Sequence, residues 1–214
     1  MFLRAEKKVF QGEAGAIDCL LDHPGEAPRG WALVLHPHPL QGGARQNKVV
    51  TTVSRACVQH GLMAVRPDFR GVGASEGEFD HAVGETADMA ALVRQVSEAY
   101  PEAAAGPFVL AGFSFGTAVA AQLYATLADD GTQVPDHLIL IGCAVERFRF
   151  REVEVPASTM LIHGEADEVV PLSESMDFAR AHDLAVTVAP DTGHFFHGKL
   201  VLLKQVLQNH LQGL

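Results

Sequence analysis

Apolar runs of strand length alternate along the chain with longer stretches whose apolar residues recur at helical spacing. From Trp31 onward the strand-length runs are continuous, as in strands that are covered on both faces of a sheet. The predicted strands span residues 31–36, 62–65, 108–111, 137–143, 158–163 and 185–189. The predicted helices span residues 45–60, 85–100, 172–182 and 200–211, with an alanine-rich helix after Gly116. This alternation predicts a mostly parallel sheet wrapped by helices on both faces.

The N-terminal region shows a different pattern. Residues 9–10 and 16–22 predict the two strands of a hairpin joined through residues 11–15. No repeat, low-complexity tract or linker divides the rest of the chain, so residues 1–214 are predicted to form a single domain.

The composition narrows the class of protein. A net charge of −10 argues against binding to nucleic acid or to anionic membranes. The three cysteines are widely spaced in apolar surroundings, which favours buried, reduced thiols. The N-terminal stretch MFLRAEKKVFQGE has no apolar core of signal-peptide length, and no run approaches the roughly 20 residues of a membrane helix. We expect a soluble, cytoplasmic protein.

The candidate chemistry centres on Gly112-Phe113-Ser114-Phe115-Gly116, which follows an apolar strand and opens the alanine-rich helix. This is the strand–turn–helix context of a G-x-S-x-G nucleophile elbow, where a sharp turn exposes the serine hydroxyl. A side chain at Gly112 or Gly116 would push the helix and the strand apart. The alternative is an ordinary glycine-rich turn with an N-capping serine. Residues 73–77 match the same motif around Ser75, but no strand runs into them and carboxylates follow, so Ser75 is predicted to lie in a loop.

A serine nucleophile needs a base and an acid that orients the base. When the serine lies on such an elbow, the acid comes next along the chain and the histidine base comes last. For the acid we favour Asp167, a few residues past the strand at 158–163; Glu165 and Glu168 are read as solvated charges. His163 is interpreted as structural. For the base we favour His194, the first histidine after the last strand.

Two residues near His194 have other interpretations. His197 is the alternative base, with packing or capping of the last helix as its other role. Asp191 lies too close in sequence to orient the base and is interpreted as a turn former.

An oxyanion hole should combine the backbone N–H of Phe115 with one from the loop HPHPLQGG at residues 36–43. Proline has no N–H, so His38 and Leu40 remain as donors, with His38 the first choice by position. His36 and His38 could also form a metal pair, but no third ligand lies nearby in sequence, and we expect no metal.

These segments together resemble the α/β-hydrolase superfamily, specifically its small bacterial serine hydrolases without a lid domain. The motifs are the elbow, HPHPLQGG, RPDFRGVGASEGEFD, HGEADEVVP and GHFFHGK, and the likeness runs from about Trp31 to Lys199. The resemblance implies the α/β-hydrolase fold, a sheet of roughly eight strands and a triad of Ser114, His194 and Asp167. The chain lacks the HGGG sequence of lipases, which leaves the second oxyanion donor open.

The segment where many such enzymes carry a lid is short here, at residues 144–155, so we expect an open site that favours small or extended soluble substrates over a long lipid. It contains Arg147-Phe148-Arg149-Phe150-Arg151, and an extended chain would place the arginines on one face and the phenylalanines on the other. We favour an exposed strip with the phenylalanines packed inward. The alternative is a substrate rim in which Arg149 recognises an anion.

The sequence therefore predicts a serine hydrolase that cleaves small carboxylic esters through an acyl-enzyme, without a cofactor. A thioesterase is the alternative within the same chemistry. A binding module that keeps the fold without activity is the alternative from a different class. The residues alone identify neither the natural ester nor the oligomeric state.

Overall fold

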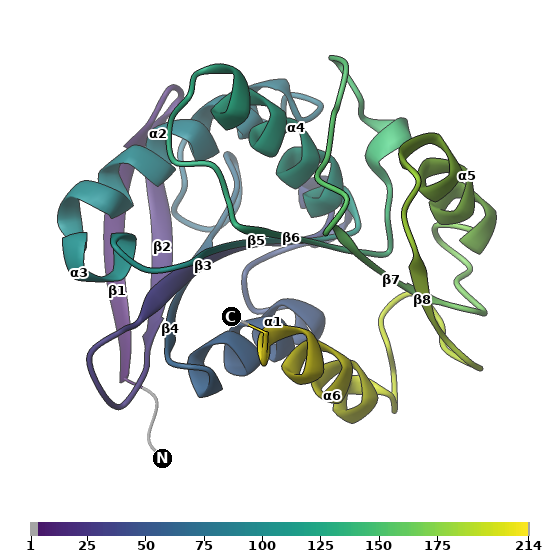
Figure 1. Ribbon diagram of the computed structural model, residues 1–214. Coiled ribbons are helices and arrows are strands. Elements are labelled where there is room, and N and C mark those ends of the chain that lie inside the picture. The colour runs from purple at the N-terminus through teal and green to yellow at the C-terminus, as the bar shows by residue number, and fades with distance from the viewer. Residues whose placement is uncertain (1–3, 214) are drawn as a thin grey trace.

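A computed structural model describes residues 4–213 and places one eight-stranded sheet at the centre of the molecule (Figure 1). The strand order is β1-β2-β4-β3-β5-β6-β7-β8. The strands are β1 (Arg4–Gly12), β2 (Gly15–His23), β3 (Gly30–Leu35), β4 (Leu62–Pro67), β5 (Phe108–Phe113), β6 (His137–Ile141), β7 (Met160–Gly164) and β8 (Val186–Ala189). Strands β1 and β2 run antiparallel, and the strands from β4 to β8 in this order are parallel to one another. The predicted fold class is confirmed.

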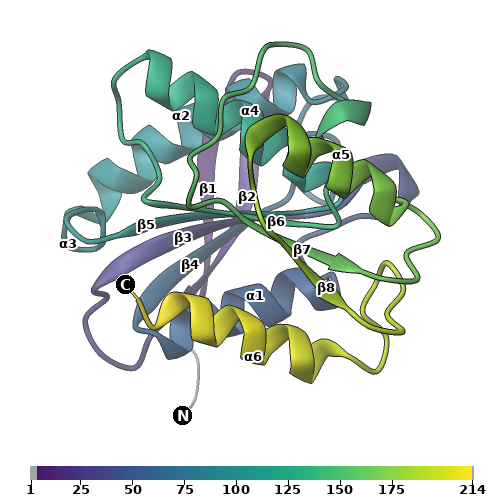
Figure 2. The same cartoon turned by 45° about the vertical axis from the view of Figure 1, so that its right-hand side comes forward.

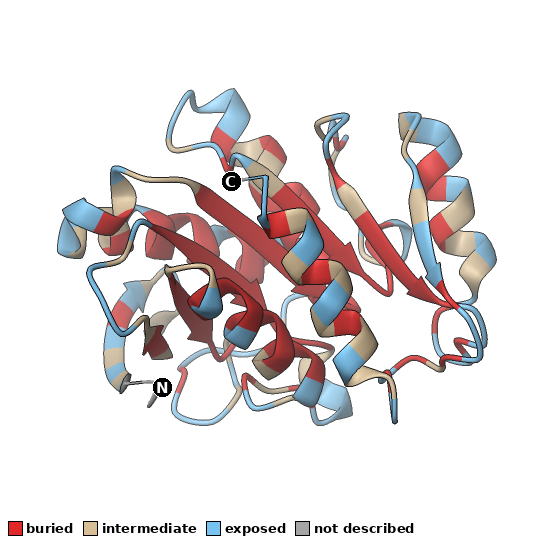
Figure 3. Ribbon diagram, turned by 60° about the horizontal axis from the view of Figure 1, so that its bottom comes forward, coloured by how far each residue is buried: buried red, intermediate tan, exposed pale blue. Residues whose placement is uncertain are grey.

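Helices cover both faces of the sheet (Figure 2). Helices α1 (Lys48–Gln59) and α6 (Leu200–Leu211) pack on one face, whereas α2 (Val83–Ala99), α4 (Phe115–Asp129) and α5 (Leu172–His182) lie on the other. A short α3 (Pro101–Ala104) follows α2. Side chains on β3 alternate between the two layers, because Ala32 and Val34 pack with the α1 and α6 side and Leu33 packs with the α2 and α4 side. Both faces of the central strands are therefore buried (Figure 3).

The N-terminal hairpin is longer than the sequence pattern indicates. Strands β1 and β2 pair from Arg4 with His23 to Gly12 with Gly15, and only Glu13 and Ala14 connect them. Apart from Phe10, the residues of β1 whose burial is described are exposed or half-buried, so this edge strand has few apolar positions to mark it. Residues 1–3, which begin the stretch where we expect no export signal, and residue 214 lie outside the described residues.

Helix α1 begins at Lys48, three residues later than predicted. Asn47 caps this helix, because its side-chain oxygen accepts the Val49 N–H at 2.9 Å. Arg45 belongs to the preceding loop, where its guanidinium donates to the Asp18 carboxylate at 2.7 Å. The cap places Asn47 where the loop enters the helix.

The parallel strands bring their carboxyl ends to one edge of the sheet, where sites of such folds form. Ser114 follows β5 directly, and Asp167 and His194 come from the loops after β7 and β8. The connection at residues 142–159 contains only a short 3₁₀ turn, η2 (Val145–Arg147). Among the described residues, this connection therefore carries no lid over the edge.

The three cysteines are buried and unpaired, and burial raises the pKa of the Cys57 and Cys143 thiols to about 12. Within residues 4–213, the helices lack the length and apolar character that crossing a membrane requires.

Candidate active site

Ser114 occupies a sharp turn between β5 and α4. Its φ of 55° and ψ of −120° lie outside the regions that residues with a side chain ordinarily adopt. A Cβ on Gly112 would lie 2.2 Å from the Gly116 carbonyl oxygen, and one on Gly116 would lie 2.6 Å from the Leu35 carbonyl oxygen. The two glycines thus permit the close approach of strand and helix that the motif predicts.

Asp167 and His194 form a buried pair. Nδ1 of His194 lies 2.7 Å from Oδ2 of Asp167, and the side chains of both residues are almost fully buried. The other oxygen of Asp167, Oδ1, accepts the Val169 N–H at 2.9 Å and the Val170 N–H at 2.8 Å. Burial raises the pKa of Asp167, but hydrogen bonds from His163, His194 and the backbone outweigh burial and hold this pKa well below its usual range. Asp167 is therefore ionised at neutral pH.

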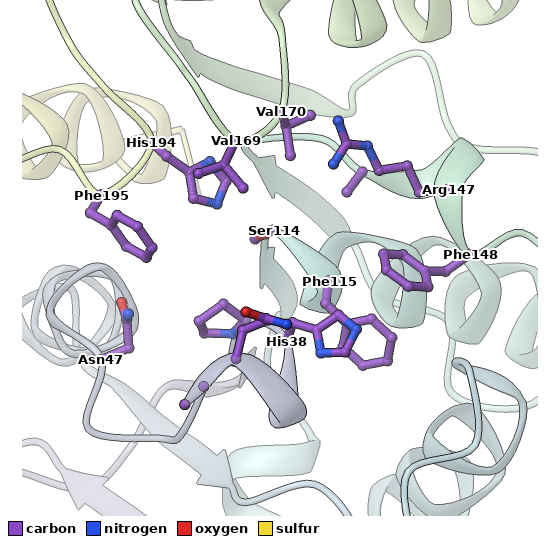
Figure 4. Close-up of a pocket in the computed structure, with 15 residues that line it drawn as sticks. His38, Asn47, Ser114, Phe115, Arg147, Phe148, Val169, Val170, His194 and Phe195 are labelled. Atoms are coloured by element: carbon purple, nitrogen blue, oxygen red, sulfur yellow. The ribbon is translucent and has the colours of Figure 1, made fainter.

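Ser114 and His194 line the same pocket, a cavity of about 220 Å³ (Figure 4). Aromatic and aliphatic side chains make up much of its wall, with Asn47 on one side and Arg147 on the other. The structure thus brings a strained serine and a histidine to one cavity, with the carboxylate partner of the histidine buried behind it. This set can support nucleophilic attack assisted by a general base.

The competing residues lie elsewhere. Glu165 is exposed and its carboxylate accepts the Asp191 N–H at 3.0 Å, whereas Glu168 is exposed and accepts the His194 N–H at 3.4 Å. His197 is exposed and does not line the cavity of Ser114. Asp191 lies in a turn with a φ of 48°, in keeping with its predicted role.

The serine of the second motif also has a structural place. Ser75 Oγ donates to the Asp68 carbonyl at 2.8 Å and accepts the Asp18 N–H at 2.9 Å. Its side chain joins two segments of backbone outside the cavity, and Ser75 lies in a loop as predicted.

The predicted oxyanion donors are only partly brought together. Phe115 is the first residue of α4, so its N–H has no acceptor within the helix, and both Phe115 and His38 line the cavity. The prediction of Leu40 as the alternative donor from the 36–43 loop is wrong. The Leu40 N–H donates to His38 Nδ1 at 3.2 Å, and Leu40 does not line the cavity. His38 is the N-cap of the short 3₁₀ turn η1 (Pro39–Gln41), and the side chain of this cap accepts the Leu40 N–H.

His36 is a structural histidine. Its Nδ1 donates to the Pro37 carbonyl at 2.7 Å and its Nε2 accepts the Phe69 N–H at 2.9 Å. Burial lowers the pKa of His36 to about 4, so the ring is neutral. Both nitrogens are occupied by backbone groups, and His36 is therefore not available as a metal partner for His38.

Residues 47–201 match the family described as serine hydrolase (FSH1). The chain belongs to this serine hydrolase family. Membership assigns hydrolase activity to a fold whose cavity holds Ser114 and His194.

Two solved structures resemble this serine hydrolase along most of their length. XC6422 from Xanthomonas campestris, a lidless α/β serine hydrolase, is 35% identical, with 98% of this chain and 94% of that chain covered and a TM-score of 0.87. An α/β serine hydrolase homologue from Coxiella burnetii is 33% identical, with 96% and 97% covered and a TM-score of 0.83. The uncharacterized protein RP471 of Rickettsia prowazekii (strain Madrid E) is 29% identical over 213 residues, covering 94% of this chain and 87% of that protein.

The arginine segment of the hydrolase corrects one prediction. Arg149 does not line the cavity; its guanidinium lies 3.4 Å from the Glu146 carboxylate and 3.9 Å from that of Glu152. Arg147 is the arginine at the cavity, and two of its nitrogens donate to the Glu174 carboxylate at 2.7 and 2.6 Å. Arg147 ends the turn η2 and Phe148 follows it with a φ of −131° and a ψ of 19°, so the segment does not begin in the extended conformation that a common face of arginines requires.

The phenylalanines of this segment differ from each other. Phe148 packs against the core and lines the cavity of the hydrolase, whereas Phe150 is 43% exposed. The expectation that both pack inward is therefore correct for Phe148 alone.

Sequence reasoning missed other residues that line the cavity. They are Gln41, Asn47, Arg147, Phe148, Val169, Val170 and Phe195. Asn47 had a recognisable local signal, since asparagine before an apolar-periodic stretch is typical of a helix N-cap. Its amide oxygen is occupied by the Val49 N–H, which leaves the amide nitrogen as the donor available to the cavity.

Proposed function

We propose that this hydrolase cleaves small carboxylic esters through an acyl-enzyme on Ser114, with His194 as general base and Asp167 as the residue that orients it. The observation that carries the proposal is the 2.7 Å contact between His194 Nδ1 and Asp167 Oδ2 behind the cavity that holds Ser114. Because the carboxylate occupies Nδ1, the other ring nitrogen, Nε2, is left to accept a proton.

In the first half of the reaction, Ser114 Oγ attacks the ester carbonyl carbon and His194 Nε2 takes the hydroxyl proton. The intermediate collapses when the carbon–oxygen bond to the alcohol breaks, and the proton passes from His194 to the departing oxygen. In the second half, a water molecule attacks the acyl group, gives its proton to His194, and releases the acid as Ser114 recovers its proton. Asp167 remains ionised throughout and stabilises the imidazolium that forms in each half.

The negative charge of the intermediate needs fixed donors. The proposed donors are the backbone N–H groups of Phe115 and His38. The carbonyl oxygen of His38 accepts both the Gln41 and the Gly43 N–H at 3.0 Å, which holds the loop in one conformation. A loop that is fixed before charge develops loses no free energy in reorganising during the reaction.

The size and lining of the cavity support the proposal of a small, uncharged substrate. Its volume of about 220 Å³ and its apolar wall suit a short acyl or aryl group, and no lid covers it within the described residues. The thioesterase alternative rested on an anion-recognising arginine rim. Arg147, Arg149 and Arg151 are each paired with carboxylates, which removes that support.

We also propose that the enzyme acts in the cytoplasm. Cys19, Cys57 and Cys143 are buried and unpaired, which suits a compartment that keeps thiols reduced. Fractionation of the source cells, with immunodetection of the enzyme, tests this location.

Intact-mass spectrometry after treatment with a fluorophosphonate tests the proposed nucleophile. Wild-type protein should gain one adduct, Ser114→Ala should gain none, and Ser75→Ala is the matched control because residues 73–77 spell the same motif. Circular dichroism confirms that each variant is folded. A folded wild type that gains no adduct would contradict the proposal and favour a binding module without hydrolytic activity.

A further inference from the structure

A second buried histidine lies behind the Asp167–His194 pair. His163 is on β7, its side chain has no solvent exposure, and the proposed reaction assigns it no role. Its Nε2 lies 2.8 Å from the Val170 carbonyl oxygen and 3.3 Å from Asp167 Oδ2. Asp167 Oδ2 is also the oxygen that lies 2.7 Å from His194 Nδ1. Two imidazole rings therefore meet at one carboxylate oxygen.

The neighbours of His163 determine which ring nitrogen carries hydrogen. A carbonyl oxygen and an ionised carboxylate can only accept, so Nε2 of His163 is an N–H shared between Val170 and Asp167. The other nitrogen, Nδ1, lies 2.6 Å from Oγ of Ser175, a buried residue of α5. In the neutral ring Nδ1 accepts the serine hydroxyl hydrogen. The two acceptors at Nε2 thus determine the tautomer of His163, and the Ser175 hydroxyl of helix α5 anchors the other side of the ring.

The shared N–H acts on both ends of the loop that carries the acid. His163 immediately precedes this loop and Val170 ends it, so the contact between them closes residues 164–170. Within the loop, Asp167 Oδ1 accepts the N–H groups of Val169 and Val170. With His163 and His194 at Oδ2, donors from four residues surround the carboxylate, and its plane is defined from both sides.

We propose that His163 is a positioning residue of this hydrolase, whose ring is anchored by Ser175 and whose Nε2–H holds the Asp167 carboxylate in the orientation that receives His194. The inference rests on the proposed roles of Ser114, Asp167 and His194. Its alternative is a side chain that only fills space between β7 and α5. A positioning role requires a hydrogen-bond donor at the Nε2 location. A space-filling role requires only a side chain of similar volume.

Two amide substitutions separate these requirements. In His163→Gln the amide nitrogen can reach the Nε2 location, whereas in His163→Asn it reaches only the Nδ1 location. We expect His163→Asn to react with the fluorophosphonate on the order of 10- to 100-fold more slowly than wild type, as misorientation of a catalytic group does. We expect His163→Gln to keep most of the wild-type rate. With p-nitrophenyl acetate as substrate, the loss in His163→Asn should fall on kcat and leave KM unchanged.

A spectroscopic measurement provides an independent readout. The proton between His194 Nδ1 and Asp167 should give a strongly deshielded ¹H NMR signal, retained in His163→Gln and moved or lost in His163→Asn. If His163→Asn does not fold, Ser175→Ala replaces it, because this variant keeps the ring and removes only its Nδ1 partner. Ser175→Ala should slow fluorophosphonate labelling and move the same signal.

The outcomes distinguish the inference from the proposed function. Equal rates and unchanged signals in the two amide variants would overturn the positioning role while leaving Ser114 as the nucleophile. Equal losses in both variants would also overturn it, because a donor at Nε2 would then make no difference. A wild type that does not react would refute the proposed function itself.

Discussion

His194 Nδ1 lies 2.7 Å from Asp167 Oδ2, although the two residues are 27 positions apart in the chain. They meet because β7 and β8 are parallel neighbours, so the loops that follow the two strands emerge at the same edge of the sheet. Water is excluded from this contact, since both side chains are almost fully buried. Charge that develops on His194 would therefore interact with Asp167 in a medium of low dielectric constant.

Asp167→Asn should abolish most of the activity. An amide has no charge to stabilise the imidazolium and favours the wrong tautomer of His194, which lowers kcat by about 10⁴ in a triad. Hydrolysis of p-nitrophenyl acetate measures the effect. Glu165→Gln is the matched control, because Glu165 is an exposed carboxylate of the same loop that contacts the Asp191 N–H rather than the imidazole of His194. Similar losses in the two variants would contradict the assignment of the acid.

Gly116→Ala should destabilise the elbow. The new Cβ would lie 2.6 Å from the Leu35 carbonyl oxygen, so strand or helix has to move. We expect the free energy of unfolding to fall by about 3 kcal/mol or more, the upper range for overpacking. Urea denaturation measures this change. Gly213→Ala is the control, since its Cβ would approach nothing closer than 3.8 Å, and equal effects would show that the close approach at Gly116 is not limiting.

The free energy of unfolding should decrease as the pH is lowered, over a range set by the pKa values of His36 in the folded and unfolded states. Its pKa is lowered by burial to about 4, whereas the unfolded ring has its ordinary pKa near 6.5. Between these values the unfolded state binds more protons, so stability is complete above about pH 6.5 and is lost as pH falls toward about 4. A shift of this size corresponds to at most about 3 kcal/mol.

Urea denaturation from pH 4 to pH 7 tests this window. In His36→Gln, the side-chain oxygen can still accept the Phe69 N–H but does not titrate. The free energy of unfolding of this variant should therefore depend less steeply on pH than that of wild type. Parallel curves for the two proteins would show that His36 does not contribute.

The arginine at the cavity should become available to substrate when its partner is neutralised. In Glu174→Gln, Arg147 loses the carboxylate that occupies its guanidinium, so KM for an anionic ester should fall several-fold relative to a neutral ester. Arg149→Ala should change neither value, because Arg149 does not line the cavity. Steady-state kinetics with a matched pair of p-nitrophenyl esters measures both effects. If Arg149→Ala raised KM for the anionic ester but not for the neutral ester, Arg149 would recognise the anion after all.

Tertiary contacts explain why the rim could not be assigned from sequence. An alternating Arg-Phe segment predicts one basic face only if the chain is extended, and here the segment begins at the end of η2. The partners of its arginines then come from separate elements: Glu174 of α5, Glu146 of η2 and Asp129 of α4. Only the pair of Glu146 with Arg149, three positions apart, is local in sequence; the other two pairings depend on how the elements pack. Leu40 is a local case, because its N–H is taken by the side chain of His38, two positions before it.

What the sequence by itself determined is local in origin. The elbow could be recognised because strand, glycine spacing and helix are consecutive, and steric contact within that turn decides the residue types. The order of strands and helices followed from apolar periodicity, and the order of Ser114, Asp167 and His194 followed from their places after strands.

Only the tertiary structure decided which side chains meet across the sheet edge. It selected the Asp167 carboxylate over those of Glu165 and Glu168, placed Asn47 and Arg147 at the cavity, and set His163 against Asp167. The physical reason is that hydrogen bonds and ion pairs depend on distances of a few ångströms between groups from different elements. Periodicity predicts which face of an element is buried, but it does not specify which distant atom that face will meet.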